Sequence, residues 1–277
     1  MKKSKKTLLP LFYKKKPRRP LSEKQKKLLK FNLKKFLFKK NFSTKKKIFL
    51  EIGFGYGENL INLSINNNNK IIIGCEIYEP GIASTIDKIE KKKLKNILIY
   101  PKNILTLIDE LKRNSIDKVF MLYPDPWPKK KHFKRRLISK IFLKKLHKIL
   151  KKNGMTLIST DSLSYLCAIF YEFSLNPNFK WANKDVAGCY KRPLEIIKSK
   201  YERKADIERN DKYFLKFKKR LNPLQETKDS YNQRNKFDEK ELKEFSILFL
   251  VLNNLDIFRK KIELISEVNF SSNELND

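Results

Sequence analysis

Two carboxylates and a glycine-rich turn are the residues of this chain best suited to hold a nucleoside. Three glycines alternate with other residues directly after the apolar stretch 48–52, namely Gly53, Gly55 and Gly57. Glycine lets a backbone turn sharply and pass close to a ligand. Glu51 lies inside this stretch, and Glu76 ends a second apolar stretch, 71–75, at the spacing where a carboxylate accepts hydrogen bonds from ribose hydroxyls. The pattern predicts a site for a nucleoside cofactor.

The spacing of the glycines favours S-adenosylmethionine over a dinucleotide. A dinucleotide-binding turn reads G-x-G-x-x-G and places a pyrophosphate at a helix N-terminus. Here the turn reads G-x-G-x-G, and the residue that follows it, Glu58, would repel a diphosphate. The sulfonium and ammonium groups of S-adenosylmethionine are cationic, so nearby carboxylates stabilise them. A tight turn without any ligand is the alternative.

A proline-rich loop and a basic stretch form a second candidate site. Residues 123–136 read YPDPWPKKKHFKRR, and the prolines on either side of Asp125 and Trp127 are expected to hold these two side chains in place. An acid beside a basic, aromatic strip is typical of a site that binds a nucleic-acid backbone and presents one base to the acid. The alternative is the start of a basic helix after a proline-rich turn.

Alternating apolar and amphipathic stretches predict a parallel, doubly wound α/β sheet with helices on both faces. We expect strands at about 47–53, 70–76, 97–101, 117–123 and 155–160, and helices at about 57–66, 79–93, 104–113 and 135–152. The last helix is expected to end at the C-cap signal Asn153-Gly154. Ligands bind beyond the carboxyl ends of such strands, where Glu76, Asn103, Asp125 and Asp161 fall. Residues 213–218 alternate like a final edge strand.

We expect three parts in the chain. Residues 1–46 form a basic arm and a helix with Ser22 as N-cap and Gln25 at the capping-box position. Residues 47–221 form the domain that binds S-adenosylmethionine. Residues 222–277 form a polar linker and an amphipathic helical extension, in which apolar residues recur every three or four positions. The extension is expected to pack on the main domain or on a copy of itself.

The overall charge and the cysteines narrow the class of protein. The formal net charge is +34, which favours an anionic partner such as nucleic acid. Three widely separated cysteines without a C-x-x-C motif are typical of a reduced, cytoplasmic protein. We expect no metal site, because the histidines and cysteines form no ligand set, and no membrane span, because the longest apolar run, 247–252, is too short. A monomer or a homodimer is expected.

Five motifs together resemble the bacterial tRNA (guanine-N7-)-methyltransferases. They are L-E-I-G-F-G-Y-G, G-C-E-I, Y-P-D-P-W-P-K-K-K-H-F-K-R-R, S-T-D and S-K-Y-E, within residues 17–220. The resemblance implies an enzyme that uses S-adenosylmethionine to methylate N7 of guanine 46 in the variable loop of tRNA. It implies the cofactor contacts Glu51, Glu76, Asn103 and Asp125, with Asp125 also the catalytic residue. It implies the substrate contacts Lys129, Asp161, Ser199, Lys200, Tyr201 and Glu202, and the RNA contacts Lys131, His132, Phe133, Lys134, Arg135 and Arg136. The family usually has Thr in place of Ser199 and often Asp in place of Asn103.

Guanine N7 carries a free lone pair, so it can attack the methyl group without a general base. We therefore expect Asp125 to orient the base or to help hold the cofactor, with Asp161 as the other candidate for the guanine edge. Other readings are another S-adenosylmethionine-dependent RNA methyltransferase or a non-catalytic RNA-binding module. An amino-methyltransferase lacks support because the chain has no acid-Pro-Pro-aromatic loop, and Glu58 disfavours a nicotinamide dehydrogenase.

Overall fold

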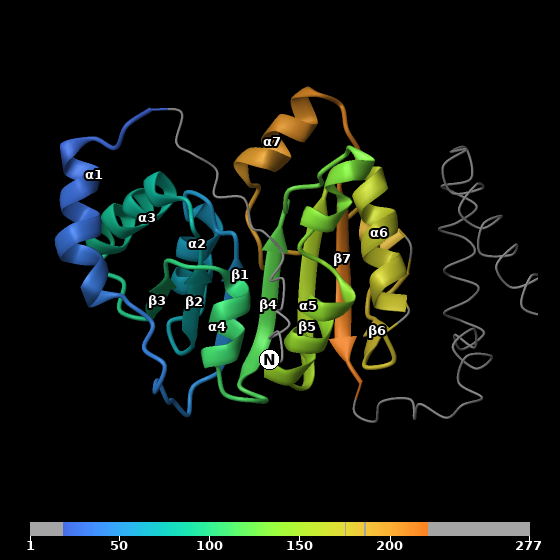
Figure 1. Ribbon diagram of the computed structural model, residues 1–277, viewed down its shortest axis with the longest axis horizontal. Coiled ribbons are helices and arrows are strands. Elements are labelled where there is room, and N and C mark those ends of the chain that lie inside the picture. Colours follow the sequence, from blue (N-terminus) through green and yellow to red (C-terminus); the bar gives the residue numbers. More distant parts are fainter. Residues whose placement is uncertain (1–18, 175, 186, 221–277) are drawn as a thin grey trace, which may run out of the picture. The chain divides into compact units, whose positions relative to one another are not determined.

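One sheet organises the protein. The computed structural model describes residues 19–174, 176–185 and 187–220, and within them seven strands pair in the order β3-β2-β1-β4-β5-β7-β6 (Figure 1). The strands are β1 (Ile48–Ile52), β2 (Ile71–Cys75), β3 (Ile97–Tyr100), β4 (Ile116–Leu122), β5 (Leu150–Thr160), β6 (Phe179–Trp181) and β7 (Tyr213–Lys219). The pairings among β1 to β5 are parallel, whereas β7 pairs antiparallel with both β5 and β6. This doubly wound, Rossmann-like sheet confirms the predicted fold class.

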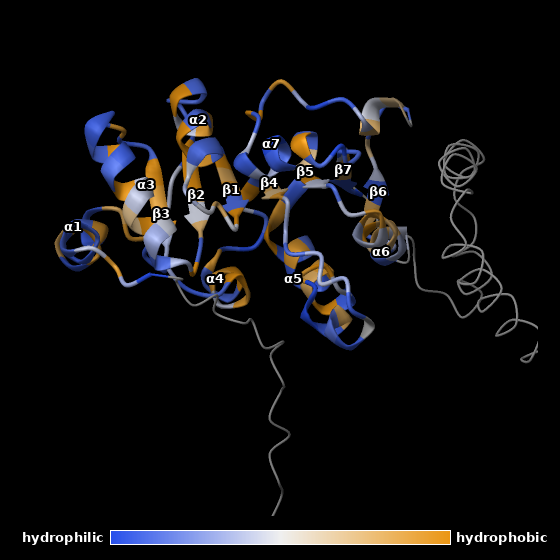
Figure 2. Cartoon of the chain, turned by 90° about the horizontal axis from the view of Figure 1, so that it is seen from above, coloured by the Kyte–Doolittle hydropathy of each residue, from blue (hydrophilic) through white to orange (hydrophobic). Residues whose placement is uncertain are grey.

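Helices cover both faces of the sheet (Figure 2). One face carries α2 (Glu58–Asn66) and α3 (Glu79–Lys91), and the other carries α4 (Ile104–Glu110), α5 (Lys140–Ile149) and α6 (Leu163–Ser174). The remaining helical segments are α1 (Glu23–Lys27), the π-helix η1 (Leu28–Asn32), α7 (Lys200–Ile207) and the 3₁₀ segments η2 (Leu33–Lys35), η3 (Lys130–Arg135) and η4 (Ala187–Cys189). The switch of faces follows from the strand order, because the chain crosses from β3 back over β2 and β1 to β4.

The N-terminal helix begins as the sequence predicts. The Ser22 hydroxyl accepts a hydrogen bond from the Gln25 backbone N–H at 3.3 Å, and the Gln25 side chain accepts one from the Ser22 N–H at 3.0 Å. This capping box satisfies two N–H groups that the first helical turn cannot pair. Lys24 then forms an ion pair with Asp87 of α3 at 2.8 Å. The N-terminal helix therefore packs beside α3.

The helix predicted at 135–152 is wrong at both ends. Residues 130–135 form the separate segment η3, and α5 begins only after its own N-cap, Ser139. The helix also ends earlier, because Leu150 already pairs with Ile116 of β4. Asn153, with a φ of 60°, therefore lies inside the long strand β5 and does not follow a helix.

The prediction that residues 213–218 form an edge strand is also wrong. β7 lies between β5 and β6, and the edge is the short strand β6, which the sequence did not predict. Phe214 and Leu215 project to opposite faces and are both buried, with 1% and 0% exposure. The ring of Phe217 stacks on Phe173 of α6 with the centroids 3.8 Å apart. A strand covered on both faces and paired along both sides is an interior strand.

The predicted extension, 222–277, lies outside the residues that the structure describes. Within the described part of the chain, no helix has the length and apolar character needed to cross a membrane. The same part contains no group of three or more His, Cys, Asp or Glu side chains arranged to hold a metal ion. Gly188 donates its backbone N–H to the Asp185 carboxylate at 2.6 Å.

Candidate active site

The turn after β1 depends on backbone angles that favour glycine. Gly53, Gly55 and Gly57 have φ values of 73°, 56° and 75°. A Cβ atom on Gly57 would lie 2.3 Å from the Thr85 hydroxyl, so this glycine also lets the start of α2 pack against α3. The space beside Gly53 and Gly55 is open, with no atom within 4 Å of a Cβ built there. A bound molecule can therefore approach the backbone of this turn.

Glu76 follows β2 and braces the turn. Its carboxylate accepts hydrogen bonds from the backbone N–H groups of Gly55 at 2.8 Å, Ile77 at 2.7 Å and Tyr78 at 3.0 Å. Burial raises the pKa of Glu76, and these hydrogen bonds lower it. Each carboxylate oxygen has more than one acceptor site. Glu76 can therefore accept hydrogen bonds from ribose hydroxyls while the backbone fixes its orientation.

Glu51 lies on β1 with 3% exposure. Burial raises its pKa to about 8, the Asn59 amide lowers it, and the charge of Glu76 raises it. Among the described residues, the buried Oε2 atom of Glu51 accepts no hydrogen bond. A carboxylate in such a place is stabilised by a cation that replaces the lost water. An ammonium or sulfonium group beside the open glycine turn fits this requirement, so these residues fit S-adenosylmethionine.

A cavity of about 380 Å³ lies next to the end of β2, beside the residue that follows Glu76. It is lined by Leu29, Leu33, Ile77, Glu79, Ile82, Pro101 and Asn103. Asn103 also caps α4, because its Oδ1 atom accepts from the Leu105 N–H at 2.8 Å. Its volume lies within the range of small-molecule sites, and most of its lining residues are apolar. Asn103 can therefore contact a ligand only through atoms that its capping role leaves available.

The loop after β4 is held by side chains as well as by its prolines. Tyr123 and Trp127 adopt left-handed φ values of 52° and 44°. Arg136 donates from Nε to the Pro126 carbonyl at 2.8 Å and from its two terminal nitrogens to Ser164 at 3.3 and 3.2 Å. Asp125 is exposed at the centre of this loop. Arg136, which the sequence analysis assigns to RNA contact, therefore connects this loop to Ser164.

Arg136 lacks the exposure expected of a residue that contacts RNA. Its side chain is buried, with 8% exposure, and its guanidinium group lies 3.9 Å from the centre of the Phe133 ring. A guanidinium group that donates three hydrogen bonds inside the protein is not free to neutralise a phosphate. We therefore assign Arg136 to the support of the loop. The other basic residues of 129–136 remain the predicted RNA strip.

The strip itself combines exposed and half-buried side chains. Lys129, Lys131, Phe133 and Lys134 are exposed. His132 and Arg135 lie against the Trp127 ring, at 5.6 and 4.9 Å from its centre. Loss of hydration and the positive charges of the neighbouring Arg and Lys side chains lower the pKa of His132 and so disfavour its protonated form. Lys129, Lys131 and Lys134 are therefore exposed positive charges of this segment.

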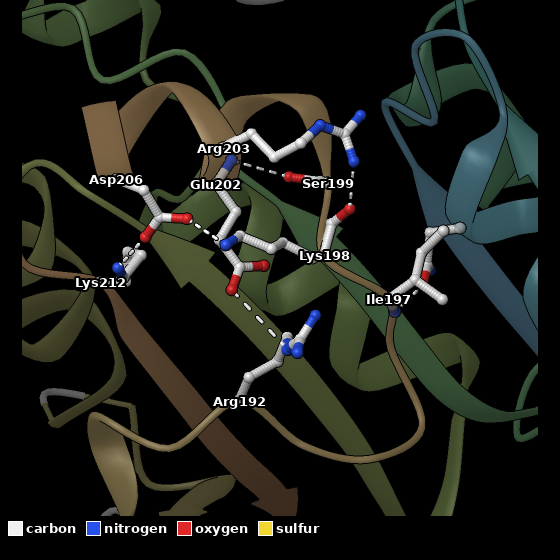
Figure 3. A network of polar contacts seen from close by, with 9 residues as sticks. Arg192, Ile197, Lys198, Ser199, Glu202, Arg203, Asp206 and Lys212 are labelled. Carbon is white, nitrogen blue, oxygen red and sulfur yellow. Dashed lines mark hydrogen bonds and ion pairs between the residues drawn. The ribbon is translucent and has the colours of Figure 1, made fainter. Parts of the chain in front are cut away.

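The segment that carries the S-K-Y-E motif forms a polar network at the start of α7 (Figure 3). The Ser199 hydroxyl accepts from the Glu202 N–H at 3.1 Å and caps the helix. The Glu202 carboxylate, with 5% exposure, has one oxygen 3.7 Å from Arg192 Nε and another, Oε2, that accepts no hydrogen bond among the described residues. Lys198 and Lys212 both pair with Asp206. The buried carboxylate of Glu202 therefore retains acceptor capacity that the fold does not use.

Two tyrosines connect this network to the rest of the rim. The Tyr123 hydroxyl is buried without a hydrogen-bond partner in the described chain, and burial, followed by the charges of Glu202 and Asp161, raises its pKa. The Tyr201 ring stacks on Tyr123 with centroids 6.4 Å apart and remains 52% exposed. Burial and the carboxylates of Asp125 and Glu76 raise the pKa of Tyr201. The structure thus brings Asp125 and Glu76, which follow β4 and β2, near the exposed Tyr201 ring, and Glu202 and Asp161 near Tyr123.

Comparison with known proteins shows to which family this chain belongs. A family model for methyltransferases, Methyltransf_4, matches residues 45–215. The tRNA (guanine-N(7)-)-methyltransferase of Jannaschia sp. is 34% identical over 176 residues, which cover 63% of this chain and 73% of that protein. The chain belongs to the tRNA (guanine-N7-)-methyltransferase family. The member from Wolbachia pipientis is 41% identical over 123 residues, covering 44% of this chain and 56% of that protein.

Another matched relative is much longer than this chain. The "bifunctional methyltransferase" of Rickettsia conorii is 37% identical over 188 residues, which cover 67% of this chain and 35% of that protein. The chain therefore spans about a third of the length of this curated relative.

Three residues of the candidate site were not predicted from the sequence. They are Asn59, Tyr123 and Arg192. The Asn59 side chain lowers the pKa of Glu51, the charge of Glu202 raises the pKa of Tyr123, and Arg192 lies 3.7 Å from the Glu202 carboxylate. The only sequence signal was a polar residue, Asn59, directly after the glycine turn, where a helix facing the sheet should be apolar.

Proposed function

We propose that this family member transfers a methyl group from S-adenosylmethionine to N7 of guanine 46 in the variable loop of tRNA. One observation carries the proposal: the buried Glu51 carboxylate, which lacks a hydrogen-bond partner in the described chain, shares a strand-end rim with the braced Asp125 loop and the exposed Tyr201 ring. A cation site and a base-sized aromatic surface at one rim suit the two reactants. The names of the Jannaschia and Wolbachia relatives support the choice of tRNA and of N7.

The protein's part in holding the cofactor follows from the burial of its acids. Glu51 would face the cationic end of S-adenosylmethionine, and Glu76 would accept hydrogen bonds from the ribose. The cavity beside Asn103 would take the adenine base. When bound, S-adenosylmethionine supplies an activated methyl group. The open space beside Gly55 allows the backbone to approach it without a steric conflict.

The acids on the far side of the rim are suited to hold guanine. Guanine offers N1–H and N2–H₂ donors on one edge, and the carboxylates of Asp125, Asp161 and Glu202 are acceptors. Glu202 is buried and retains an oxygen without a hydrogen-bond partner in the described residues, so it has acceptor capacity for this edge. A base that leaves its own stack is stabilised by stacking on an aromatic side chain, for which Tyr201 is exposed.

The reaction then depends mainly on position. N7 attacks the methyl carbon with its own lone pair, the bond from carbon to sulfur breaks, and the positive charge moves from sulfur to the guanine ring. No proton has to leave N7, so Asp125 is not required as a base. Carboxylates beside the ring stabilise the charge that arrives there, and a fixed in-line geometry supplies most of the rate.

The charge around the loop supplies affinity for the RNA backbone. Lys129, Lys131 and Lys134 are exposed next to the loop that carries Asp125. Phosphate contacts by such lysines add affinity that does not depend on base sequence. We therefore assign recognition of one base to the acids and tRNA affinity to the strip.

The experiment that tests the proposal uses an unmodified tRNA transcript and S-adenosylmethionine labelled in its methyl group. We expect one labelled 7-methylguanosine, mapped to position 46. Label at another position or atom would favour a different RNA methyltransferase. Tight tRNA binding without any transfer would favour a non-catalytic RNA-binding protein.

A further inference from the structure

Arg192 is a cationic neighbour of the buried Glu202 carboxylate. It lies in the segment between η4 and α7, and its Nε atom is 3.7 Å from Oε1 of Glu202. Figure 3 shows the guanidinium group reaching from this segment toward the carboxylate. The distance is that of an ion pair and is too long for a hydrogen bond. Within the described part of the chain the Arg192 side chain makes no other ion pair or hydrogen bond, so its donors are available to a ligand.

The segment that carries Arg192 is held on both sides. Before it, the Tyr190 ring packs on Tyr213 of β7, with the ring centroids 5.4 Å apart. After it, the Ile197 backbone N–H donates to Oδ1 of the buried Asn59 at 3.3 Å. The Arg192 side chain itself remains 39% exposed. A fixed backbone therefore presents a guanidinium group that a bound molecule can reach.

The tyrosine pair of the rim lies next to these two charges. Tyr201 directly precedes Glu202 on α7, and its ring stacks on Tyr123. The Tyr123 hydroxyl is buried and has no hydrogen-bond partner among the described residues. Burial, followed by the charge of Glu202, raises the pKa of Tyr123, and the charge of Arg192 lowers it. Both charged groups are therefore close to the aromatic surface on which the guanine is proposed to stack.

The two charged groups have opposite hydrogen-bonding roles. A guanidinium group only donates, and an ionised carboxylate only accepts. The edge of guanine that carries O6, N1–H and N2–H₂ offers one acceptor beside two donors, so it fits a guanidinium beside a carboxylate. Adenine offers the N6–H₂ donor beside the N1 acceptor, so the same pair opposes it. Guanine N7 lies on a different edge and stays free to receive the methyl group.

We propose that Arg192 binds O6 of the target guanine while Glu202 binds N1–H and N2–H₂, so that the pair selects guanine over adenine. This inference rests on the proposed function, which supplies the guanine. A cation beside a ring that becomes positively charged does not stabilise the transition state. Arg192 therefore determines which base is accepted, and it does not accelerate the transfer by its charge.

The test changes single atoms of the base and compares the full-length wild type with three variants. The tRNAs carry guanosine, 6-thioguanosine or inosine at position 46. Sulfur in place of O6 is a weak acceptor, whereas inosine keeps O6 and N1–H and lacks only the N2 amino group. We expect the wild type to prefer guanosine over each analogue on the order of tenfold in kcat/KM, as for a hydrogen bond to a charged group.

The variants separate the contact to O6 from the contact to N2. Arg192→Met should lose the preference over 6-thioguanosine and keep the preference over inosine, because Glu202 binds the N2 amino group. Arg192→Lys keeps a cationic donor and should retain part of the preference over 6-thioguanosine. Arg203→Met is the matched control, because it removes an arginine of α7 that pairs with Glu58 at 3.1 Å, and it should keep both preferences. A merely structural role of Arg192 would reduce both preferences together.

Two results would overturn the inference. A wild type that methylates the 6-thioguanosine and guanosine tRNAs equally well would exclude a contact to O6, and this result does not depend on the folding of any variant. An Arg192→Met variant that keeps the wild-type preference over 6-thioguanosine would exclude Arg192 as that contact. A failure of the proposed function is different, because the wild type would then transfer no methyl group to N7 of guanine 46.

Discussion

Replacing Glu51 by Gln should abolish the release of a proton that accompanies cofactor binding. Burial raises the pKa of Glu51 from its ordinary 4.5 to about 8 in the free protein. At pH 7, about one unit below that value, only about one molecule in ten carries the carboxylate. A cofactor cation bound beside Glu51 requires the ionised form, so binding at pH 7 should release close to one proton and cost about 1.4 kcal/mol. As the pH is raised toward 8, the apparent affinity should rise about tenfold per pH unit. Above pH 8 it should level off.

Isothermal calorimetry in buffers with different ionisation enthalpies measures this proton directly. The wild type should release about 0.9 proton per S-adenosylmethionine bound at pH 7, because Glu51 is ionised in only about a tenth of the free protein. Glu51→Gln keeps the size of the side chain but cannot titrate. The proton release measured for this variant therefore gives the contribution of the ligand itself and serves as the control value. Equal proton release by the wild type and Glu51→Gln would refute the assignment of Glu51 to the cofactor cation.

Three further variants test the turn, the loop and the strip. Gly55→Val should abolish S-adenosylmethionine binding in calorimetry, because a branched side chain enters the open space beside the turn. The φ of 56° at this position adds strain of about 1–2 kcal/mol for a residue other than glycine. Wild-type affinity of the variant would contradict this prediction. Asp125→Ala should lower turnover far more than tRNA affinity, and Asp125→Asn should retain more activity than Ala; equal losses of turnover and affinity would indicate a structural loop. Removing two exposed lysines from the strip should flatten the slope of log affinity against log salt by about two units, and removing two at the opposite ends of the strands should not. The two pairs are Lys131 with Lys134, and Lys92 with Lys95. If both pairs lose the same slope, the RNA is held by diffuse charge.

The parts of the fold that the sequence predicts are those with a local signal. The capping box of Ser22 and Gln25 lies within four residues, and the glycine turn follows its strand directly. The order of the parallel strands then brings Glu76, Asn103 and Asp125 to one rim. Each of these features needs only its own segment and the general topology of a doubly wound sheet.

The features that the sequence does not predict depend on contacts between distant segments. Residues 213–218 alternate like an edge strand, but β6 pairs along the outer side of β7 and makes it an interior strand, and Phe173 of α6 stacks on Phe217. Arg136 stands in a run of basic residues, and only the position of Ser164 shows that it points inward. The contact of Asn59 with Ile197 spans most of the domain. Charge and periodicity carry no information about such pairings.

The central claim is that N7 of one guanine in tRNA receives the methyl group. The most direct test compares two tRNAs that differ in one atom, the wild-type transcript and a tRNA with 7-deazaguanosine at position 46. We predict full transfer from labelled S-adenosylmethionine to the first and none to the second, with similar affinities for both, because phosphates supply most of the binding. Undiminished transfer to the 7-deaza tRNA would contradict the claim.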